Sequence, residues 1–189
     1  MSLFNFNAVS DFFLRLASGR VVFIGFLVYL AMAAGLMSWG ERTIQNLSGK
    51  KVQVLDLCFS YSPADVHRYL SEYSPEARAF AARFNLVADT VYPLSYAFFM
   101  LVLMAWIWRP VRGQWPPFKY LHLLPLAILI FDYLENICVV SMLLRFPEIS
   151  NGLIKTGSCL TSVKWSLLGL SLLLALGGLF LRLLNSLKS

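Results

Sequence analysis

Residues 130–137, Ile-Phe-Asp-Tyr-Leu-Glu-Asn-Ile, lie inside an otherwise apolar run from Leu121 to Leu144. A charged side chain at the centre of a membrane-spanning helix costs roughly 2.5–3.5 kcal/mol on insertion scales. In a helix, Asp132, Glu135 and Asn136 are spaced i, i+3 and i+4, so all three project from one face. This face is expected to point away from lipid and toward other polar groups of the protein.

The composition of the chain indicates a membrane protein. Of its 189 residues, 58% are hydrophobic and 14% are charged, against about 25% charged in globular proteins. The mean hydropathy of +0.66 is too high for a soluble domain of this length. The apolar runs are long and continuous, whereas a β-barrel shows short alternating segments. We therefore expect an all-α, multi-pass integral membrane protein.

Four transmembrane helices are expected to form a four-helix bundle, as one membrane domain over residues 1–189. The expected spans are residues 21–38, 86–108, 121–144 and 158–184, each near or above the length that crosses a bilayer. Residues 1–19 interleave aromatic and polar side chains, which predicts an amphipathic helix lying in the membrane interface. For the first span, residues 21–38, a cleaved signal peptide is the alternative, because Ala31-Met32-Ala33 resembles a signal-peptidase site.

Residues 39–85 are the one long polar region, and we expect them to form a small extracytoplasmic cap. The partly alternating pattern of residues 51–60 predicts a short strand or an extended segment. Ser62-Pro63-Ala64-Asp65 and Ser74-Pro75-Glu76 each predict a helix start, with a serine N-cap followed by proline. No breaker separates the second of these helices from the second span, so it is expected to continue into the membrane.

The positive charges predict the orientation, because short cytoplasmic loops are enriched in Lys and Arg. Three groups of basic residues fall on one side of the expected helices: Arg15 and Arg20, then Arg109, Arg112 and Lys119, then Arg182 and Lys188. We therefore expect both termini in the cytoplasm, in a bacterial inner membrane or a eukaryotic endomembrane. The net charge of +6 then reflects topology, and no nucleic-acid partner is expected.

Polar residues of the second, third and fourth spans are expected to converge in the outer half of the bilayer, given the helical rise of about 1.5 Å per residue. The predicted ligand-binding residues are Asp89, Tyr92, Tyr96, Asp132, Glu135, Asn136 and Lys164. Asp89 and Lys164 are expected to form a charge pair at the mouth of the site. Since one lysine cannot neutralise three acids, at least one carboxyl is expected to be protonated.

The layout resembles that of four-span membrane proteins of the emopamil-binding and sigma-2-receptor type. The similarity covers the topology and the character of the segment Leu86-Val87-Ala88-Asp89-Thr90-Val91-Tyr92-Pro93. Proteins of that type place acids inside their later spans around a pocket for sterols or cationic amphiphiles. The resemblance therefore implies a pocket of this kind, and it assigns no role to any single residue.

Three functions are compatible with the polar cluster. We favour an acidic intramembrane pocket that binds a lipid or another amphiphilic small molecule, with chemical modification of that molecule as a variant. The alternatives are a proton- or cation-coupled transport or relay subunit, and a structural or assembly subunit in which the cluster fixes the helix register. The latter two suit a homo-oligomer or a larger membrane complex.

The sequence predicts no metal and no other cofactor, because clustered histidines and cysteines are absent. Its three cysteines are Cys58, Cys138 and Cys159. Cys58 and Cys159 would pair only if both faced an oxidising compartment. The catalytic residues of an enzymatic variant are not identified by any motif.

Overall fold

The computed structural model describes residues 5–109 and 120–186. Its α-helices are α1 (Phe6–Leu16), α2 (Gly19–Ala31), α3 (Ser38–Ser48), α4 (Pro63–Ser71), α5 (Pro75–Trp108), α6 (Leu124–Arg145) and α7 (Asn151–Ser186). The described residues also form a π-helix, η1 (Met32–Met37), and the 3-10 helices η2 (Leu55–Leu57) and η5 (Leu121–Leu123). Arg112, Lys119 and Lys188 lie outside the described residues.

Within the residues that the structure describes, four helices are long and apolar enough to cross a membrane. They comprise residues Gly19–Ser48, Pro75–Trp108, Leu121–Arg145 and Asn151–Leu184. The prediction of a helical chain with four membrane-length helices is confirmed. The second of them runs without interruption from the predicted start at Ser74-Pro75, as the sequence indicated.

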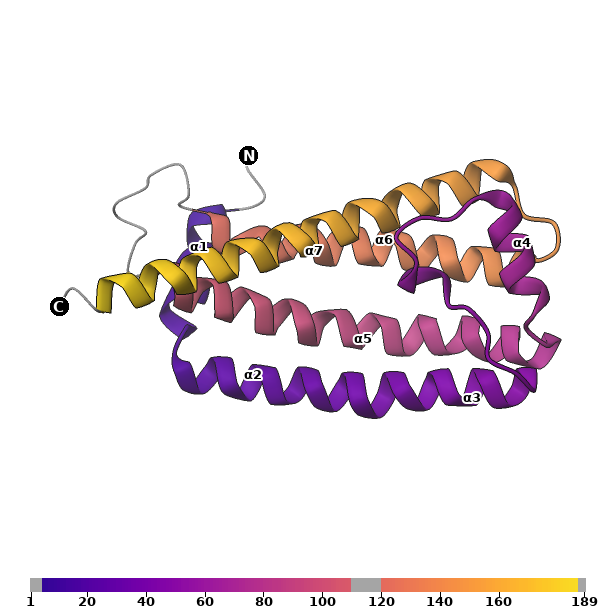
Figure 1. The fold of residues 1–189 in the computed structure, drawn as a ribbon, viewed down its shortest axis with the longest axis horizontal. Coiled ribbons are helices and arrows are strands. Elements are labelled where there is room, and N and C mark those ends of the chain that lie inside the picture. Colours follow the sequence, from indigo (N-terminus) through magenta and orange to yellow (C-terminus); the bar gives the residue numbers. More distant parts are fainter. Residues whose placement is uncertain (1–4, 110–119, 187–189) are drawn as a thin grey trace.

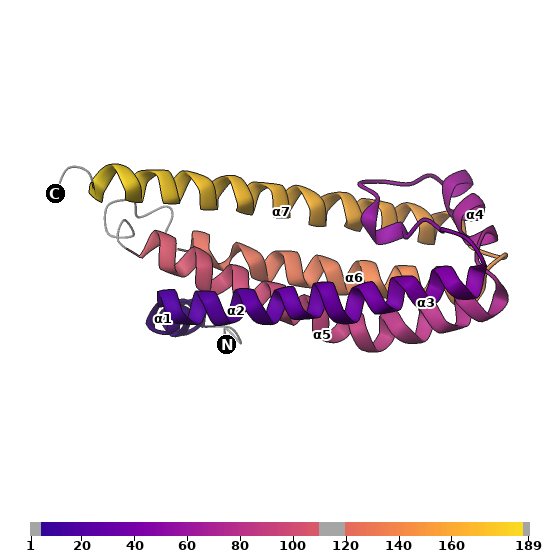
Figure 2. The same ribbon diagram turned by 60° about the horizontal axis from the view of Figure 1, so that its bottom comes forward.

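The long helices lie side by side along the molecule (Figure 1). We call the end that carries α4 the cap end, and the end that carries α1 and the last turns of α7 the terminal end. α5 packs against α2, α3 and α6, and α6 also packs against α7. In both views α2 lies on the α5 side of this assembly and α7 lies on the α6 side (Figure 2).

The first long helix ends later than its predicted span, and the last long helix begins earlier than its predicted span. Residues 39–48, expected in the cap, continue the first helix through η1 and α3. This helix ends at Gly49, whose φ of 69° is a left-handed conformation that glycine adopts without strain. α7 begins at Asn151, ahead of the predicted residue 158, and the Ser150 hydroxyl accepts a hydrogen bond from the Leu153 amide at 3.3 Å. The irregular part of the cap is therefore shorter than predicted.

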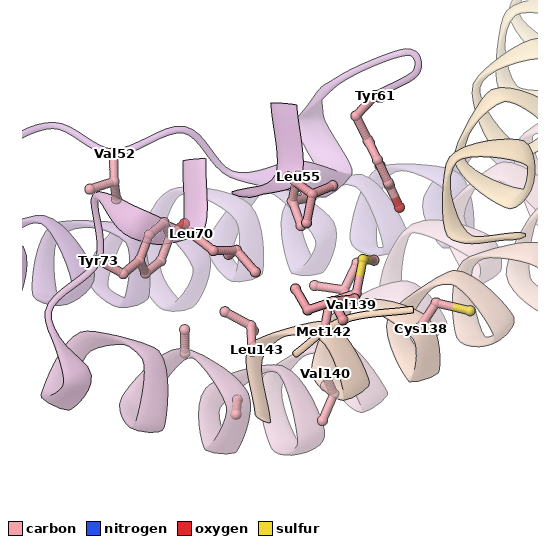
Figure 3. Close-up of a cluster of buried hydrophobic side chains, with 14 of the residues drawn as sticks. Val52, Leu55, Tyr61, Leu70, Tyr73, Cys138, Val139, Val140, Met142 and Leu143 are labelled. Atoms are coloured by element: carbon pink, nitrogen blue, oxygen red, sulfur yellow. The ribbon is translucent and has the colours of Figure 1, made fainter. Parts of the chain in front are cut away.

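The cap end is organised by a hydrophobic core between the 49–73 region and the cap-end half of α6 (Figure 3). Residues 51–54 are extended, η2 follows, and no strand forms within residues 5–109 or 120–186, so the strand alternative is wrong. The core includes Val52, Leu55, Tyr61, Val66, Leu70, Tyr73, Val139, Val140, Met142 and Leu143. It fixes the loop before α4 against the ends of α6 and α7.

The predicted helix start at α4 is confirmed, and it gives a pH-dependent prediction. Ser62 and Asp65 form a capping box, in which the Asp65 carboxylate accepts hydrogen bonds from the Ser62 amide at 3.0 Å and hydroxyl at 2.7 Å. These bonds, with a smaller effect of Arg68, lower the pKa of Asp65. The cap therefore stabilises the fold above the ordinary aspartate pKa of about 4, and this contribution is lost as the pH falls through the lowered value.

We expect Asp65→Asn to reduce the melting temperature at pH 7, since the amide no longer accepts as a charged group. The difference from the wild type should shrink steadily as the pH falls below about 4. Thermal unfolding of both proteins in detergent, measured at a series of pH values, checks this. A difference that is constant with pH would show that the carboxylate charge does not matter to the cap.

Candidate functional site

A cavity of about 400 Å³ lies between the long helices, toward the cap end. Residues of α5, α6 and α7 make most of its wall, with Tyr29 of α2 and Asp56 and Leu57 of η2 completing it. All seven residues predicted to bind a ligand line it: Asp89, Tyr92, Tyr96, Asp132, Glu135, Asn136 and Lys164. The structure therefore brings these side chains together around one space, and their role in binding stays a prediction.

α5 contributes a stripe of cavity-lining side chains. Asn85, Asp89, Tyr92, Tyr96 and Met100 recur every three or four residues, which places them on one face of the helix. The stripe covers about 22 Å of helix axis at 1.5 Å per residue. With its amide oriented so that the nitrogen donates, Asn85 reaches the Ala81 carbonyl and Asp89 Oδ2, each at 3.2 Å.

The centre of the site is an ion cluster that joins α6 to α7. Lys164 Nζ lies 3.0 Å from Asp132 Oδ1 and also contacts Glu135 Oε2. The three side chains are 11%, 16% and 1% exposed, for Lys164, Asp132 and Glu135 respectively. The predicted pair between Asp89 and Lys164 is wrong. α7 packs mainly along α6, where two carboxyls spaced i, i+3 face the ammonium group together.

Two further side chains hold the acids of α6 in place. The Thr161 hydroxyl donates to Glu135 Oε1 at 2.6 Å, and it lies 3.5 Å from the Tyr61 hydroxyl. Glu135 and Thr161 are completely buried. The Asn136 amide donates to the Asn85 carbonyl at 3.2 Å, which connects α6 to α5. The polar cluster thus fixes the positions of three helices around the cavity.

The lining of the cavity changes from polar to apolar along its length. The acids, amides and Lys164 lie toward the cap end. Toward the terminal end the wall is formed by Phe99, Met100, Ile128, Leu168 and Leu172. Tyr29 stacks on Tyr92 and on Phe99, with ring centroids 6.2 and 5.9 Å apart, and so forms the α2 part of the wall. The site can therefore accommodate a polar group at one end and an apolar body at the other.

Asp56 is the acid that sequence reasoning missed. η2 places it on the cap side of the cavity, where the Trp165 indole donates to its backbone carbonyl at 3.1 Å. Burial raises the pKa of the Asp56 carboxyl, while the charge of Lys164 acts in the opposite direction. Its sequence neighbours are apolar, which hinted at burial. No local pattern indicated which surface the loop would cover.

Asn85 and Thr161 were also absent from the predicted site, although their spacing gave a signal. Asn85 precedes Asp89 by four residues, and Thr161 precedes Lys164 by three, so each shares a helix face with a predicted residue. Tyr29 comes from α2, which the sequence analysis assigned to no site. Its contribution depends on how α2 packs against α5.

Within residues 5–109 and 120–186, no group of three or more His, Cys, Asp or Glu side chains is arranged to hold a metal ion. Cys58, Cys138 and Cys159 are free thiols in the structure. No protein-family model, no curated protein and no solved structure matches this chain.

Proposed function

We propose that the cavity binds a membrane lipid or another amphiphile, with its polar end toward the cap and its apolar end toward the middle of the helices. The observation that supports this most directly is the ordered change from polar to apolar lining within one cavity. The volume of about 400 Å³ falls within the range of roughly 300–1,000 Å³ that is typical of small-molecule pockets.

The arrangement of the helices supports entry of the ligand from the side. Tyr29 of α2 and Leu168 of α7 line opposite parts of the cavity, while α2 packs on α5 and α7 packs on α6. Exposed apolar side chains cover both outer helices, including Phe23 at 61% and Leu173 at 69% exposure. We propose that these faces contact acyl chains and that the ligand enters between α2 and α7 from the lipid.

The orientation of the ligand follows from the proposed topology. If the basic residues of the terminal end face the cytoplasm, the cap lies on the extracytoplasmic side. The polar half of the cavity then opens at the level of the outer leaflet, where lipid head groups lie. A reaction on the ligand would place the reacting group beside Asp89 or Glu135, since these are the candidate acids and bases near the polar end.

A structural role is the second candidate, and the ion cluster favours it. Lys164 binds two acids of α6, so the cluster joins α6 and α7 whether or not a ligand is present. Transport has less support, because the terminal-end half of the cavity wall consists of apolar side chains such as Met100 and Ile128. A proton or cation would find few polar groups there to carry it onward.

The proposal is tested by filling the apolar half of the cavity without changing the ion cluster. Leu168→Trp places a large side chain in the wall of the cavity, whereas Leu170→Trp, on the same helix, adds the same side chain at a position that is 46% exposed. Both proteins are purified from membranes, their melting temperatures are compared, and the co-purifying molecules are identified by mass spectrometry.

We expect Leu168→Trp to lose a molecule that the wild type and Leu170→Trp both retain, because the tail no longer fits. Asp132→Asn and Glu135→Gln should alter the amount or the head group of that molecule. Identical lipid content in all these proteins, at unchanged melting temperature, would rule out a binding pocket. Lower stability of the acid variants with unchanged lipid would favour the structural role.

A further inference from the structure

The loop of residues 51–62 reaches back from the cap end along α7, toward the middle of the molecule (Figure 1, Figure 2). Side chains on one face of α7 bind its backbone at three points. These hydrogen bonds run from the Trp165 indole to the Asp56 carbonyl at 3.1 Å, from the Ser162 hydroxyl to the Phe59 carbonyl at 2.9 Å, and from the Tyr61 amide to the Ser158 hydroxyl at 2.9 Å. The loop thus follows α7 for about 10 Å, and its tip, at Asp56, lies level with Trp165.

Hydrogen bonds and ion pairs between the helices show how deep this tip lies. The ion pair of Asp132 with α7 puts the tip of the loop level with Asp132 of α6. Four residues toward the cap end, the Asn136 amide donates to the Asn85 carbonyl of α5 at 3.2 Å. Arg83 is exposed and lies two residues beyond Asn85. At 1.5 Å per residue, the tip is therefore about 9 Å closer to the middle of the helices than Arg83.

The level of Arg83 has the features of a membrane boundary. Trp39 of α3 is 56% exposed and packs on Phe84 of α5, with ring centroids 5.9 Å apart. Tryptophan and basic side chains are typical of the level at which a spanning helix leaves the hydrocarbon. Between this level and the tip of the loop, Val87 of α5 is 70% exposed and Leu134 of α6 is 44% exposed. The tip therefore lies at a depth where the surface of the neighbouring helices is apolar.

The composition and bonding of the loop suit this depth. Residues 52–61 contain one charged side chain, Asp56, and it lines the cavity. Leu57 and Phe59 are instead 60% and 61% exposed. Irregular backbone is tolerated inside a membrane only where other parts of the protein satisfy its polar groups. The hydrogen bonds from α7 do this for the carbonyls of Asp56 and Phe59.

We propose that residues 55–60 form a re-entrant loop, and that Leu57 and Phe59 lie among the acyl chains of the leaflet on the cap side. This inference rests on the proposed placement of the helices in a membrane, and it does not depend on which molecule the cavity binds. Leu57 also lines the cavity, so it forms the rim where the cavity meets the acyl chains. Part of the region expected in the extracytoplasmic cap is thus membrane-embedded.

Acyl chains explain the exposed side chains of the loop and those of the neighbouring helices together. Lipid surrounds a membrane protein on all sides, whereas a protein partner covers one face. Val87 and Leu134 belong to two different helices, and both are exposed at the depth of the loop. Leu57 and Phe59 therefore continue an apolar belt that the helices already form.

The experiment measures the depth of the loop with one nitroxide spin label at a time on the full chain, reconstituted in phosphatidylcholine vesicles. The parent protein carries Cys58→Ser, Cys138→Ala and Cys159→Ser, so that each added cysteine is the single site of labelling. Electron paramagnetic resonance then compares how often the label collides with oxygen, which concentrates in hydrocarbon, and with a water-soluble nickel complex.

The labelled positions comprise two tests and two references. Leu57→Cys and Phe59→Cys test the loop. Val87→Cys on α5 is the reference for a side chain in contact with acyl chains, and Ala64→Cys, which is exposed on α4, is the reference for water. The melting temperature of each labelled protein is compared with that of the parent. Because the two loop positions are tested separately, the proposal stays testable if one variant does not fold.

We expect the ratio of oxygen to nickel collisions at positions 57 and 59 to be several-fold higher than at position 64 and close to that at position 87. If positions 57 and 59 match position 64 while position 87 collides mainly with oxygen, the loop lies in water and the proposal fails, with the pocket unaffected. Few collisions with either reagent would place the two side chains inside the protein and would equally overturn it. If position 87 also matches position 64, the placement of the helices in a membrane fails, and the proposed function fails with it.

Discussion

Lys164→Met is expected to lower the free energy of unfolding by about 3–5 kcal/mol, the usual cost of removing one partner from a buried ion pair. Methionine preserves most of the apolar stem of lysine, so the main loss is the charge. Asp132 and Glu135 would then face each other inside the protein with no cation between them. Thr161 would remain bound to Glu135, but a single hydroxyl does not compensate a buried carboxylate.

The control for Lys164→Met is Lys155→Met on the same helix, where the side chain is exposed. A surface substitution of this kind changes stability by about 0.5 kcal/mol or less. Unfolding in detergent, by heat or by denaturant, measures both variants. If Lys164→Met were no more damaging than Lys155→Met, the ion cluster would have no part in holding α6 against α7.

A triple variant separates the cost of unpaired charge from the loss of the cluster itself. Lys164→Met combined with Asp132→Asn and Glu135→Gln removes all three charges and keeps the shapes of the side chains. Replacing a whole buried ion cluster by neutral groups is often close to neutral for stability. We therefore expect the triple variant to recover most of the stability lost in Lys164→Met. The effects of the three substitutions would then not add, as is usual for residues in contact.

The sequence was informative wherever the relevant pattern lay within one helix. The spacing of Asp89, Tyr92 and Tyr96 placed them on one face of α5, and that face lines the cavity. The serine and proline before α4 and α5 marked the starts of both helices correctly. Such patterns are local, because the helical repeat and the capping of the first turn involve residues only three or four positions apart.

The partner of Lys164 was not predictable, because it depends on the packing of separate helices. The depth of Lys164 in the expected bundle was compatible with either Asp89 or the acids of α6. The choice is made by α7, which packs on α6 more than on α5. Sequence periodicity gives the face of each helix, but it does not give the neighbour against which that face is placed.

The position of Asp56 was unpredictable for a related reason. The loop of residues 51–62 has no regular repeat beyond the three residues of η2, and side chains of α7 form hydrogen bonds with it. The Trp165 indole and the Asp56 carbonyl that it binds are separated by 109 positions in the sequence. From the sequence, this loop was expected only to be part of a cap. The structure shows that it also contributes to the cavity wall.

The approach of α6 to α7 depends on Gly157, and Gly157→Ala is expected to destabilise the protein by about 1–3 kcal/mol, as overpacking of a buried site does. A Cβ at this position would lie 2.6 Å from the Tyr61 hydroxyl, 3.1 Å from Met142 Cε and 3.3 Å from Cys138 Cβ. Tyr61 is only 6% exposed, so its hydroxyl has little room to withdraw.

Gly169→Ala on the same helix is the matched control for Gly157→Ala, because a Cβ there would meet nothing within 4 Å. Alanine is a better helix former than glycine by roughly 0.8–1.0 kcal/mol, so this variant should be more stable than the wild type. Tyr61→Phe removes the closest atom and should restore part of the stability lost in Gly157→Ala. If the two glycine variants had melting temperatures shifted equally and in the same direction, helix propensity alone would explain both. Effects of opposite sign would show that α7 makes its close contact with α6 and Tyr61 at Gly157. This glycine lies one turn before Thr161, whose hydroxyl holds Glu135 in the cavity wall.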